Sequence, residues 1–340
     1  MARWLILLVP ALAALGFLFF GQSGEDGALV VYCAHDSLYA DEVLKAFEKE
    51  TGIRVTTRFD TEATKSLGLI ELIRRERENP RCDVFWNNEL LGMLSLQKEG
   101  LLEPYQGLGH ARIPDAFKDP NGYWTGFAAR LRVWVGHRDR FPELTESSIQ
   151  TYLQQPDLSQ VAMAKPLYGT TLTHYVLLWK EMGAEALQQW HKQVREQGWQ
   201  EVGGNAVTMR LVGEGVCDLG WTDTDDFFVG LDAGKPLVMS PVRTPSGSTI
   251  FIPNTVALIN GSKKKNRARR LIDYLLSEQV ELALAHSRSR QIPLGPVPPG
   301  SLPTAVERLA AYRDDGCDLI GLEAERAACL AWLKSIDARQ

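Results

Sequence analysis

VVYCAHDSLYADEVLKAFEKETGIRV (residues 30–55) and PRCDVFWNNELLGMLSLQKEGLLEPY (residues 80–105) carry the alternation of strands and helices that decides the fold. The wholly apolar run at 29–32 is typical of a strand buried in a parallel sheet. A helical pattern of apolar residues over 43–47 follows it, and Gly52 stands where a helix C-terminal cap belongs. The first stretch therefore predicts a strand followed by a helix.

The same alternation continues through the rest of the two stretches. Further elements are expected in the order strand, helix, strand, helix at 54–59, 69–73, 83–86 and 90–96. Such an alternation over about seventy residues requires right-handed crossovers and a doubly wound parallel sheet. Ligands of these sheets bind beyond the carboxyl ends of the strands, so the loops at 33–37 and 87–89 are candidate binding loops.

A second series of elements begins near the middle of the chain. Its expected strands and helices lie at 130–135, 161–164, from 170 onward, 218–221, 250–259 and 268–276. Because the chain crosses twice between the two series, we expect an α/β fold of two lobes, each a doubly wound, mostly parallel sheet, with a ligand cleft between them. The expected hinge strands lie near Arg132 and Ser248. The predicted bounds are 28–131 and 250–285 for lobe one, and 132–249 and 286–340 for lobe two.

Length and composition set the class of protein. The 340 residues suffice for two domains, and 45% hydrophobic with 23% charged residues is typical of a soluble globular chain. A net charge of −5 gives little support for nucleic-acid binding. The one dense basic run, at 263–270, is interpreted as a solvated helix face, with a partner-binding patch as the alternative. We expect a monomer.

The amino-terminal segment indicates export. Arg3 precedes an uncharged apolar run from Trp4 to Phe20, which is interrupted by Pro10. The small residues just after the run permit cleavage, while the length of the run also permits retention as a membrane anchor. Residues 1–27 are therefore predicted to be a signal peptide or anchor plus spacer, and the protein is expected in the periplasm, free or tethered.

Five cysteines form an odd set without a CxxC pair, which argues against a zinc ribbon or a redox motif. Export permits disulfides. Cys317 and Cys329 are the best-placed pair, because both are expected in one carboxyl-terminal helical segment.

The order of these segments resembles the periplasmic iron-binding components of ferric ABC importers, which have the type II periplasmic-binding-protein fold. Besides the two stretches quoted first, the resemblance rests on GFAARLRVWV (126–135), PLYGTTLTH (166–174), GNAVTMRLVGEG (204–215) and IPNTVALI (252–259) before LIDYLLS (271–277). It implies capture of iron in the cleft and delivery to an inner-membrane ABC permease.

The resemblance also implies a set of metal ligands. In that family a histidine follows the first strand and an acidic residue follows the DVF strand, which places His35 and Glu89, or the neighbouring Asn88, in the ligand set. Two adjacent tyrosines complete the family's site. This chain departs from that pattern, because Asp225 and Asp226 stand where the tyrosines are expected.

A helper anion such as carbonate, phosphate or citrate is the family's second ligand. The matching stretch and further candidates are Tyr168, Gly169, Thr170, Thr171, Arg132 and Asn205. A helix that starts there offers free backbone N–H groups and the positive end of its dipole to an anion.

The residues alone indicate a cation site. Asp223, Asp225 and Asp226 follow a predicted strand, and three buried carboxylates would be driven to protonate without a cation. The alternative is capping of the helix that starts there. With His35 and Glu89, the aspartates would provide nitrogen and oxygen donors suited to Fe(III), Fe(II) or Mn(II).

Two classes of alternative remain open. The first keeps the transport role but replaces iron with an organic zwitterion or anion such as an aminophosphonate, its ammonium group on the aspartates. The second is a metal-dependent hydrolase in which His174 pairs with Asp226. Because the chain contains no GxSxG, Walker or HExxH motif, we expect a binding protein and no enzyme.

Overall fold

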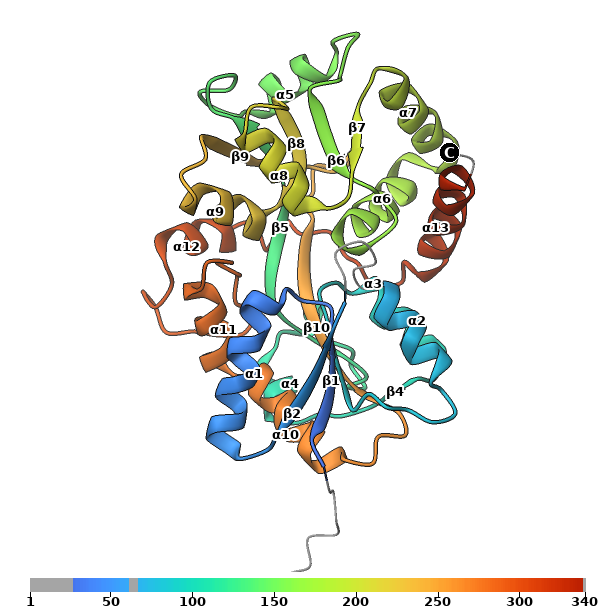
Figure 1. Ribbon diagram of the computed structural model, residues 1–340, viewed down its shortest axis with the longest axis vertical. Helices are drawn as coiled ribbons and strands as arrows, with labels where there is room; N and C mark the ends of the chain where they lie inside the picture. The colour runs from blue at the N-terminus through green and yellow to red at the C-terminus, as the bar shows by residue number, and fades with distance from the viewer. Residues whose placement is uncertain (1–26, 61–66, 339–340) are drawn as a thin grey trace, which may run out of the picture.

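The computed structural model describes residues 27–60 and 67–338, which form a mixed α/β fold of two lobes (Figure 1). Within these residues the strands form one sheet with the order β2-β1-β3-β10-β5-β8-β6-β7, while β4 pairs with β10 and β9 with β5. The strands are β1 (Leu29–Cys33), β2 (Val55–Phe59), β3 (Val84–Asn87), β4 (Leu102–Glu103), β5 (Thr125–His137), β6 (Val161–Ala164), β7 (Gln200–Val202), β8 (Leu219–Asp223), β9 (Leu237–Pro241) and β10 (Phe251–Ile259).

The helices cover the faces of this sheet. Those before β6 are α1 (Ser37–Thr51), α2 (Leu67–Arg75), α3 (Leu91–Lys98), α4 (Leu108–Arg112), a short 3-10 helix (Asp115–Phe117) and α5 (Glu146–Leu153). Those after β6 are α6 (Gly169–Met182), α7 (Ala184–Glu196), α8 (Asn205–Gly213), α9 (Thr224–Asp232), α10 (Lys265–Leu275), α11 (Glu278–His286), α12 (Thr304–Ala310) and α13 (Glu323–Asp337).

Each lobe is built on a parallel set of strands. In lobe one, β1 pairs in parallel with β2 and β3, and in lobe two β6 pairs in parallel with β7 and β8. Helix α1 shows how the sequence dictates this packing: its apolar residues face the core, and Gly52 ends it with a φ of 71°, a conformation that glycine adopts without steric cost. The predicted fold class is confirmed.

Two long strands connect the lobes. β5 pairs antiparallel with β10 over 125–131 and then with β8 and β9 over 132–137, so the strand passes from one lobe into the other (Figure 1). All but the last of its residues are buried, which accounts for its long apolar sequence. The residue bounds of the lobes stay a prediction.

The β5–β10 pairing is irregular where the strands cross. The register shifts between Ile252 and Asn254, and opposite this shift Ala128 has a φ of 42°, a rare conformation for a residue with a side chain. Its backbone groups are held in place: the amide donates to Glu281 Oε1 at 2.9 Å, and the carbonyl accepts from Asn254 Nδ2. Glu281 is completely buried and also pairs with Arg112 at 2.5 Å.

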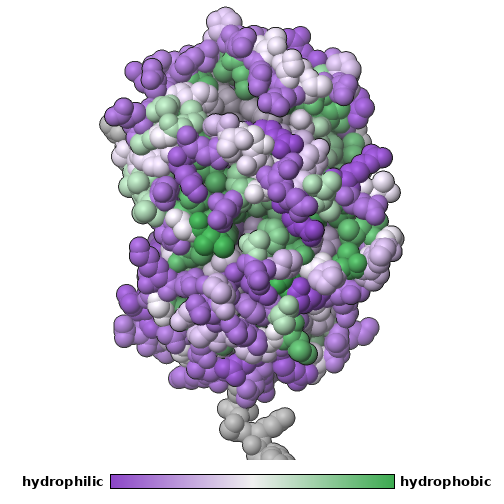
Figure 2. All heavy atoms as spheres, turned by 180° about the vertical axis from the view of Figure 1, so that it is seen from behind, coloured by the Kyte–Doolittle hydropathy of each residue, from purple (hydrophilic) through white to green (hydrophobic). Residues whose placement is uncertain are grey.

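The carboxyl-terminal segment touches both lobes. Helix α13 packs against α6 and α3, which follow β6 and β3 respectively. On the α6 side, the rings of Trp332 and Trp179 lie 5.6 Å apart, and on the α3 side Arg326 Nη1 donates to Ser95 Oγ at 3.2 Å. The face seen from behind is largely hydrophilic, with apolar side chains reaching the surface mainly at the waist between the lobes (Figure 2).

The structure bears differently on the predicted export segment and on the predicted disulfide. Residues 1–26, which hold the predicted export segment, lie outside the described residues, and no described helix has the length and apolar character needed to cross a bilayer. The Cys317–Cys329 disulfide is wrong: no disulfide joins the two within the described chain. Cys317 lies in the loop before α13 begins at Glu323, whereas Cys329 is buried within that helix.

Candidate functional site

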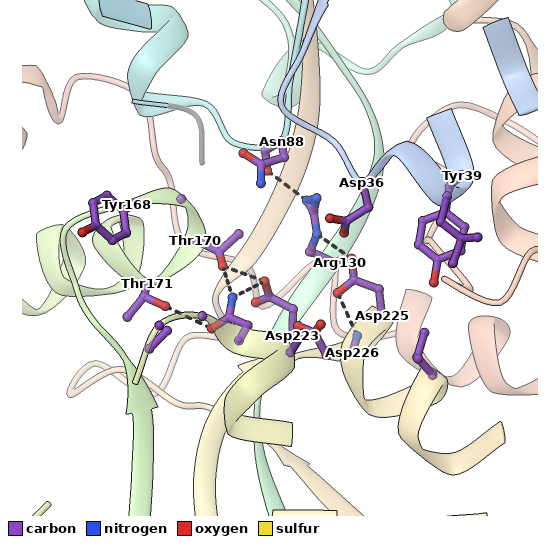
Figure 3. A pocket seen from close by; sticks show the side chains of 18 of the residues that line it. Asp36, Tyr39, Asn88, Arg130, Tyr168, Thr170, Thr171, Asp223, Asp225 and Asp226 are labelled. Carbon is purple, nitrogen blue, oxygen red and sulfur yellow. Dashed lines mark hydrogen bonds and ion pairs between the residues drawn. The ribbon is translucent and has the colours of Figure 1, made fainter. Parts of the chain in front are cut away.

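A cleft of about 320 Å³ lies between the lobes (Figure 3). Lobe one supplies the start of α1 and the loop after β3, the crossing strand β5 supplies Arg130, and lobe two supplies the remaining wall. The lining residues are Asp36, Ser37, Leu38, Tyr39, Asn88, Arg130, Ala164, Lys165, Tyr168, Gly169, Thr170, Thr171, Gly203, Gly204, Asn205, Ala206, Asp223, Asp225, Asp226 and Val229.

Four helices begin at this cleft. Residues in the first turn of α1, α6, α8 and α9 all belong to its lining. These helices follow β1, β6, β7 and β8, and in parallel sheets the carboxyl ends of the strands meet at one edge. The first amides of each helix lack a partner within the helix, so the cleft can accept an anion at its α6 and α8 walls.

A buried network fixes the floor of the cleft on the lobe-two side. The side chain of Arg132 is completely buried, and its Nη1 donates to Asp223 Oδ1 at 2.8 Å and to Asn205 Oδ1 at 3.0 Å. The other oxygen of Asp223 accepts from Thr170 Oγ1 at 2.6 Å and from Asn205 Nδ2 at 3.0 Å. Both carboxylate oxygens of Asp223 already accept hydrogen bonds from protein groups, which leaves few lone pairs for a ligand. The role of Asp223 in this structure is therefore mainly structural.

Arg130 joins the two lobes across the cleft. Its Nε lies 3.2 Å from Asp225 Oδ2 at the start of α9, and its Nη1 donates to the carbonyl oxygen of Asn88 at 2.9 Å (Figure 3). Nη2 donates to Asn254 Oδ1 at 3.4 Å on the crossing strand β10. The buried guanidinium thus offsets part of the negative charge of the aspartates.

Carboxylates gather around one end of the cleft. Oxygens of Asp223, Asp225 and Asp226 all lie within 4.8 Å of one another, the one such group of potential metal ligands found in the described residues. Asp36 and Tyr39 face them from lobe one (Figure 3). Burial, followed by the charges of Asp225, Asp36 and Asp226, raises the pKa of the Tyr39 phenol. This end of the cleft therefore concentrates negative charge, part of which Arg130 offsets.

Three predicted site residues do not reach the cleft surface. His35 is buried beside it, stacked between Trp86 and Tyr39 with ring centroids 5.4 and 5.8 Å away. Glu89 is buried because its carboxylate caps α3, accepting from the Gly92 amide at 2.9 Å. Arg132 is held by Asp223, as described above. The structure therefore does not gather His35 and Glu89 with Asp225 and Asp226.

The other predicted residues do come together. Those that line the cleft are Tyr168, Gly169, Thr170, Thr171, Asn205, Asp223, Asp225 and Asp226. Sequence reasoning missed Asp36, Tyr39, Arg130 and Lys165. Asp36 lay inside the candidate loop 33–37, and a charged residue such as Arg130 within an otherwise apolar strand is itself a signal of a buried partner.

A second cavity, of about 580 Å³, has a different character. It lies beside β10 and the segment before α13, and it is lined by Leu90, Pro114, Ala116, Phe117, Phe251, Pro253, Arg313, Asp314, Gly316, Cys317, Asp318, Leu319 and Ile320. Its lining is mainly apolar and contains neither the aspartate cluster nor the helix starts. We therefore assign the charged cleft as the candidate site.

The sequence matches a family model and has relatives among known proteins. The model of the family described as bacterial extracellular solute-binding protein matches residues 29–287. The "Major ferric iron-binding protein" of Neisseria meningitidis is 24% identical over 278 residues, covering 79% of this chain and 81% of that protein. "Iron uptake protein A1" of Synechocystis is 22% identical over 314 residues, covering 87% and 83% respectively.

Solved structures share the fold. The apo ferric ion-binding protein A of Pasteurella haemolytica superposes with a TM-score of 0.78 at 19% identity, over 91% of this chain and 98% of that one. The periplasmic binding protein AfuA of Actinobacillus pleuropneumoniae, with fructose-6-phosphate bound, has a TM-score of 0.71 at 17% identity and covers 91% and 98%. At these identities the likeness concerns the fold.

Proposed function

Since the chain belongs to the family of bacterial extracellular solute-binding proteins, we propose that it captures one small solute in the interlobe cleft and delivers it to an ABC permease of the inner membrane. The observation that carries this proposal is a charged cleft lined by both lobes and by the crossing strand β5. A ligand held by both lobes favours their closed arrangement, which a permease can distinguish from the open one. We expect the protein to act as a monomer in the periplasm.

The solute that we propose is iron, as Fe(III) carried with a helper anion. Asp225 and Asp226 offer hard oxygen donors at the aspartate end of the cleft. The starts of α6 and α8 offer amides and the side chains of Thr171 and Asn205 to an anion such as carbonate, phosphate or citrate. The relatives named above as ferric iron-binding and iron uptake proteins support this choice.

Binding of iron requires a rearrangement at Asp225. In this structure Asp225 pairs with Arg130, whose charge would repel a metal ion bound to the same carboxylate. A helper anion beside Arg130 would offset that repulsion. The iron proposal thus predicts that metal and anion bind together, each weakly without the other.

A second candidate solute is an amine-bearing anion such as an aminophosphonate. The charges of the cleft are separated: Asp36, Asp225 and Asp226 lie at one end, while Lys165 and the starts of α6 and α8 lie at the other. An ammonium group and a phosphonate could occupy these ends at the same time. The structural neighbour with fructose-6-phosphate bound shows that this fold accommodates a phosphate-bearing organic solute.

The binding role predicts that the solute is returned unchanged. His174, the potential acid–base partner of Asp226, is buried beside Trp221, with ring centroids 4.3 Å apart, and does not line the cleft. Burial, together with Arg132, holds the pKa of His174 well below its ordinary value, so the ring is neutral. The position of His174 therefore supports a protein that binds and releases its solute without converting it.

A thermal-shift titration tests the proposal. The apo-protein is mixed with Fe(III)-citrate, Fe(II), Mn(II) or 2-aminoethylphosphonate, and a ligand at about a hundred times its dissociation constant adds about 2.7 kcal/mol of stability. We expect Fe(III)-citrate to stabilise the protein, and Asp225→Asn with Asp226→Asn to abolish the shift. Asp139→Asn is the matched control, because that carboxylate is 88% exposed and does not belong to the cleft lining.

The results of this titration distinguish the proposed solute from the proposed binding role. Stabilisation by the aminophosphonate alone would overturn iron and leave the transport role standing. Conversion of any of these solutes by the purified protein would contradict the binding role itself.

A further inference from the structure

The basic run at 263–270 has no part in the proposed function. It lies at the start of α10, whose first turn contains no acidic residue and whose last turn contains no basic one. A helix is stabilised by the opposite arrangement, because its amino end carries the positive end of the dipole. The stability of α10 therefore does not explain the run, and a breach of such a local rule points to a function. The basic residues are Lys263, Lys264, Lys265, Arg267, Arg269 and Arg270.

Two carboxylates neutralise part of this charge. Oxygens of Glu103 lie 2.6 Å from Lys265 Nζ and 3.6 Å from Arg269 Nη2. Asp83 Oδ2 lies 3.2 Å from Lys264 Nζ. Two negative charges thus face three positive ones, so even the paired part of the run keeps an excess of positive charge.

The remaining basic side chains add to this excess. Lys263 and Arg270 are exposed, and neither forms an ion pair with any residue of 27–60 or 67–338. Since the whole chain carries a net charge of −5, the positive charge at the start of α10 is a local feature of one surface.

The same surface holds the first described residues of the chain. Arg267 Nη1 donates to the carbonyl oxygen of Gly27 at 2.6 Å, and Lys264 Nζ donates to that of Ala28 at 2.8 Å. Helix α10 lies at the end of lobe one that is farthest from lobe two (Figure 1). Residues 21–26, which separate Gly27 from the predicted export segment, span at most about 20 Å. This end of the protein is therefore the one held closest to the membrane during export.

We propose that the start of α10 binds the anionic phospholipid headgroups of the inner membrane. Clusters of four to eight basic residues on one helix are typical of such surfaces, because an array of headgroup phosphates contacts several side chains at once. The protein then stands end-on on the bilayer, which leaves the cleft between the lobes open to solute. The inference rests on the predicted periplasmic location and is independent of which solute is bound. The contacting residues are Lys263, Lys265, Arg267 and Arg270.

Co-sedimentation with vesicles tests this proposal. The mature chain, without residues 1–26, is mixed with vesicles of phosphatidylglycerol or of phosphatidylcholine at low and at high salt. Each basic side chain near an anionic surface increases partitioning about fivefold, and salt screens the attraction. We expect the protein to bind phosphatidylglycerol at low salt only, and Lys263→Ala with Arg270→Ala to lower its partitioning at least tenfold.

Lys334→Ala with Arg308→Ala is the matched control. These two exposed residues lie on α13 and α12, so the control has the same net charge as the test variant but an intact run at 263–270. We expect the control to partition as the wild type does. Equal melting temperatures of the three proteins establish that a loss of vesicle binding is not a loss of folding.

Three results would overturn the lipid surface: equal losses in the two double variants, equal partitioning onto both lipids, or no partitioning of the wild type at low salt. The last is the result expected if the run binds an acidic protein surface instead. The proposed function is measured separately, by the thermal shift with Fe(III)-citrate. Both double variants should keep that shift, because none of their substituted residues lines the cleft. A wild-type protein that binds vesicles but no solute would overturn the proposed function and leave this inference standing.

Discussion

Arg132 Nη1 lies 2.8 Å from Asp223 Oδ1, and the two residues stand directly opposite each other in the antiparallel pairing of β5 with β8. The arginine side chain is completely buried and that of the aspartate is 6% exposed. The pair therefore lies beneath the cleft, where it holds Thr170 and Asn205 in place. Asp223 belongs to the acidic cluster by position, but its charge is already balanced.

Replacement of Asp223 tests this structural role. Asp223→Ala leaves Arg132 buried without its counter-charge, and breaking a buried pair in this way costs about 3–5 kcal/mol of unfolding free energy. Asp226→Ala is the control, because Asp226 is only partly buried, and its hydrogen bond from Thr222 at 3.0 Å is worth about 1 kcal/mol. Chemical denaturation measures both. Equal losses in the two variants would contradict the distinction.

A salt bridge outside the cleft should favour the closed arrangement of the two lobes. Arg290 Nη1 and Nη2 lie 2.9 and 2.8 Å from the two carboxylate oxygens of Asp232. Arg290 follows α11, which packs on α1 and α10 of lobe one, while Asp232 ends α9 of lobe two. The guanidinium also lies 4.8 Å from the ring centroid of Phe228. Because Arg290 follows α11 closely, we expect it to move with lobe one, although the predicted bounds place 286–340 in lobe two, and we expect this contact to break when the lobes separate.

We therefore expect Arg290→Ala to favour the open arrangement by up to about 1 kcal/mol, since partly exposed pairs contribute little. Small-angle scattering should show a larger radius of gyration, and the solute should dissociate a few-fold faster. Arg290→Lys keeps the positive charge but cannot form the bidentate pair with the carboxylate. Its dissociation rate and radius of gyration should lie between those of the wild type and Arg290→Ala. Arg210→Ala is the control, because its partner Glu214 follows within one turn. An unchanged dissociation rate in Arg290→Ala would count against the contact as an interlobe clasp.

The strands and helices of both lobes could be predicted because their signals are local. The apolar run at 161–164 is β6 to the residue, and α1 ends at the glycine expected to cap it. The fold class followed from the alternation of these elements, and the match of the family model agrees with the predicted resemblance.

The site was harder to predict because its contacts depend on strand register and on packing. Arg132 was expected to bind an anion, but the pairing of β5 with β8 places it opposite Asp223, ninety-one positions away in sequence. His35 was expected to touch the ligand, but stacking on Trp86 draws its ring into the core. No local pattern in the sequence reveals either relationship.

The stability of the protein should fall as the pH drops from 6.5 to 4. Burial, and secondly Arg195, lowers the pKa of His191 to about 4, against about 6.5 in the unfolded chain. Between these values the unfolded chain binds the proton and the folded one does not, so protons favour unfolding. At 1.36 kcal/mol per pKa unit, the full effect is about 3 kcal/mol.

The variant His191→Gln isolates this contribution, because it cannot titrate but can still bond Tyr175, whose hydroxyl lies 2.9 Å from His191 Nδ1. Unfolding free energies measured at pH 7 and pH 4 should differ less in the variant than in the wild type. An equal difference in both would mean that His191 is not the group responsible. Glu201, 3.6 Å from His191 Nε2, is retained in both proteins.

Arg130 should control the coupling of metal and anion. Arg130→Gln removes the charge that pairs with Asp225 and that a helper anion would offset. We expect iron to bind this variant with less dependence on citrate or carbonate than it binds the wild type. Isothermal titration with iron at two anion concentrations measures the coupling; an identical anion dependence in the variant would rule out this role for Arg130.

The most direct test of the central claim is anomalous diffraction at the iron absorption edge from crystals of the mature chain grown with ferric citrate. The account predicts one strong peak per chain inside the cleft, bonded to Asp225 and Asp226 and facing Tyr39, with anion density at the start of α6. A peak bound by His35 and Glu89, or no peak in the cleft of a protein saturated with ferric citrate, would contradict it.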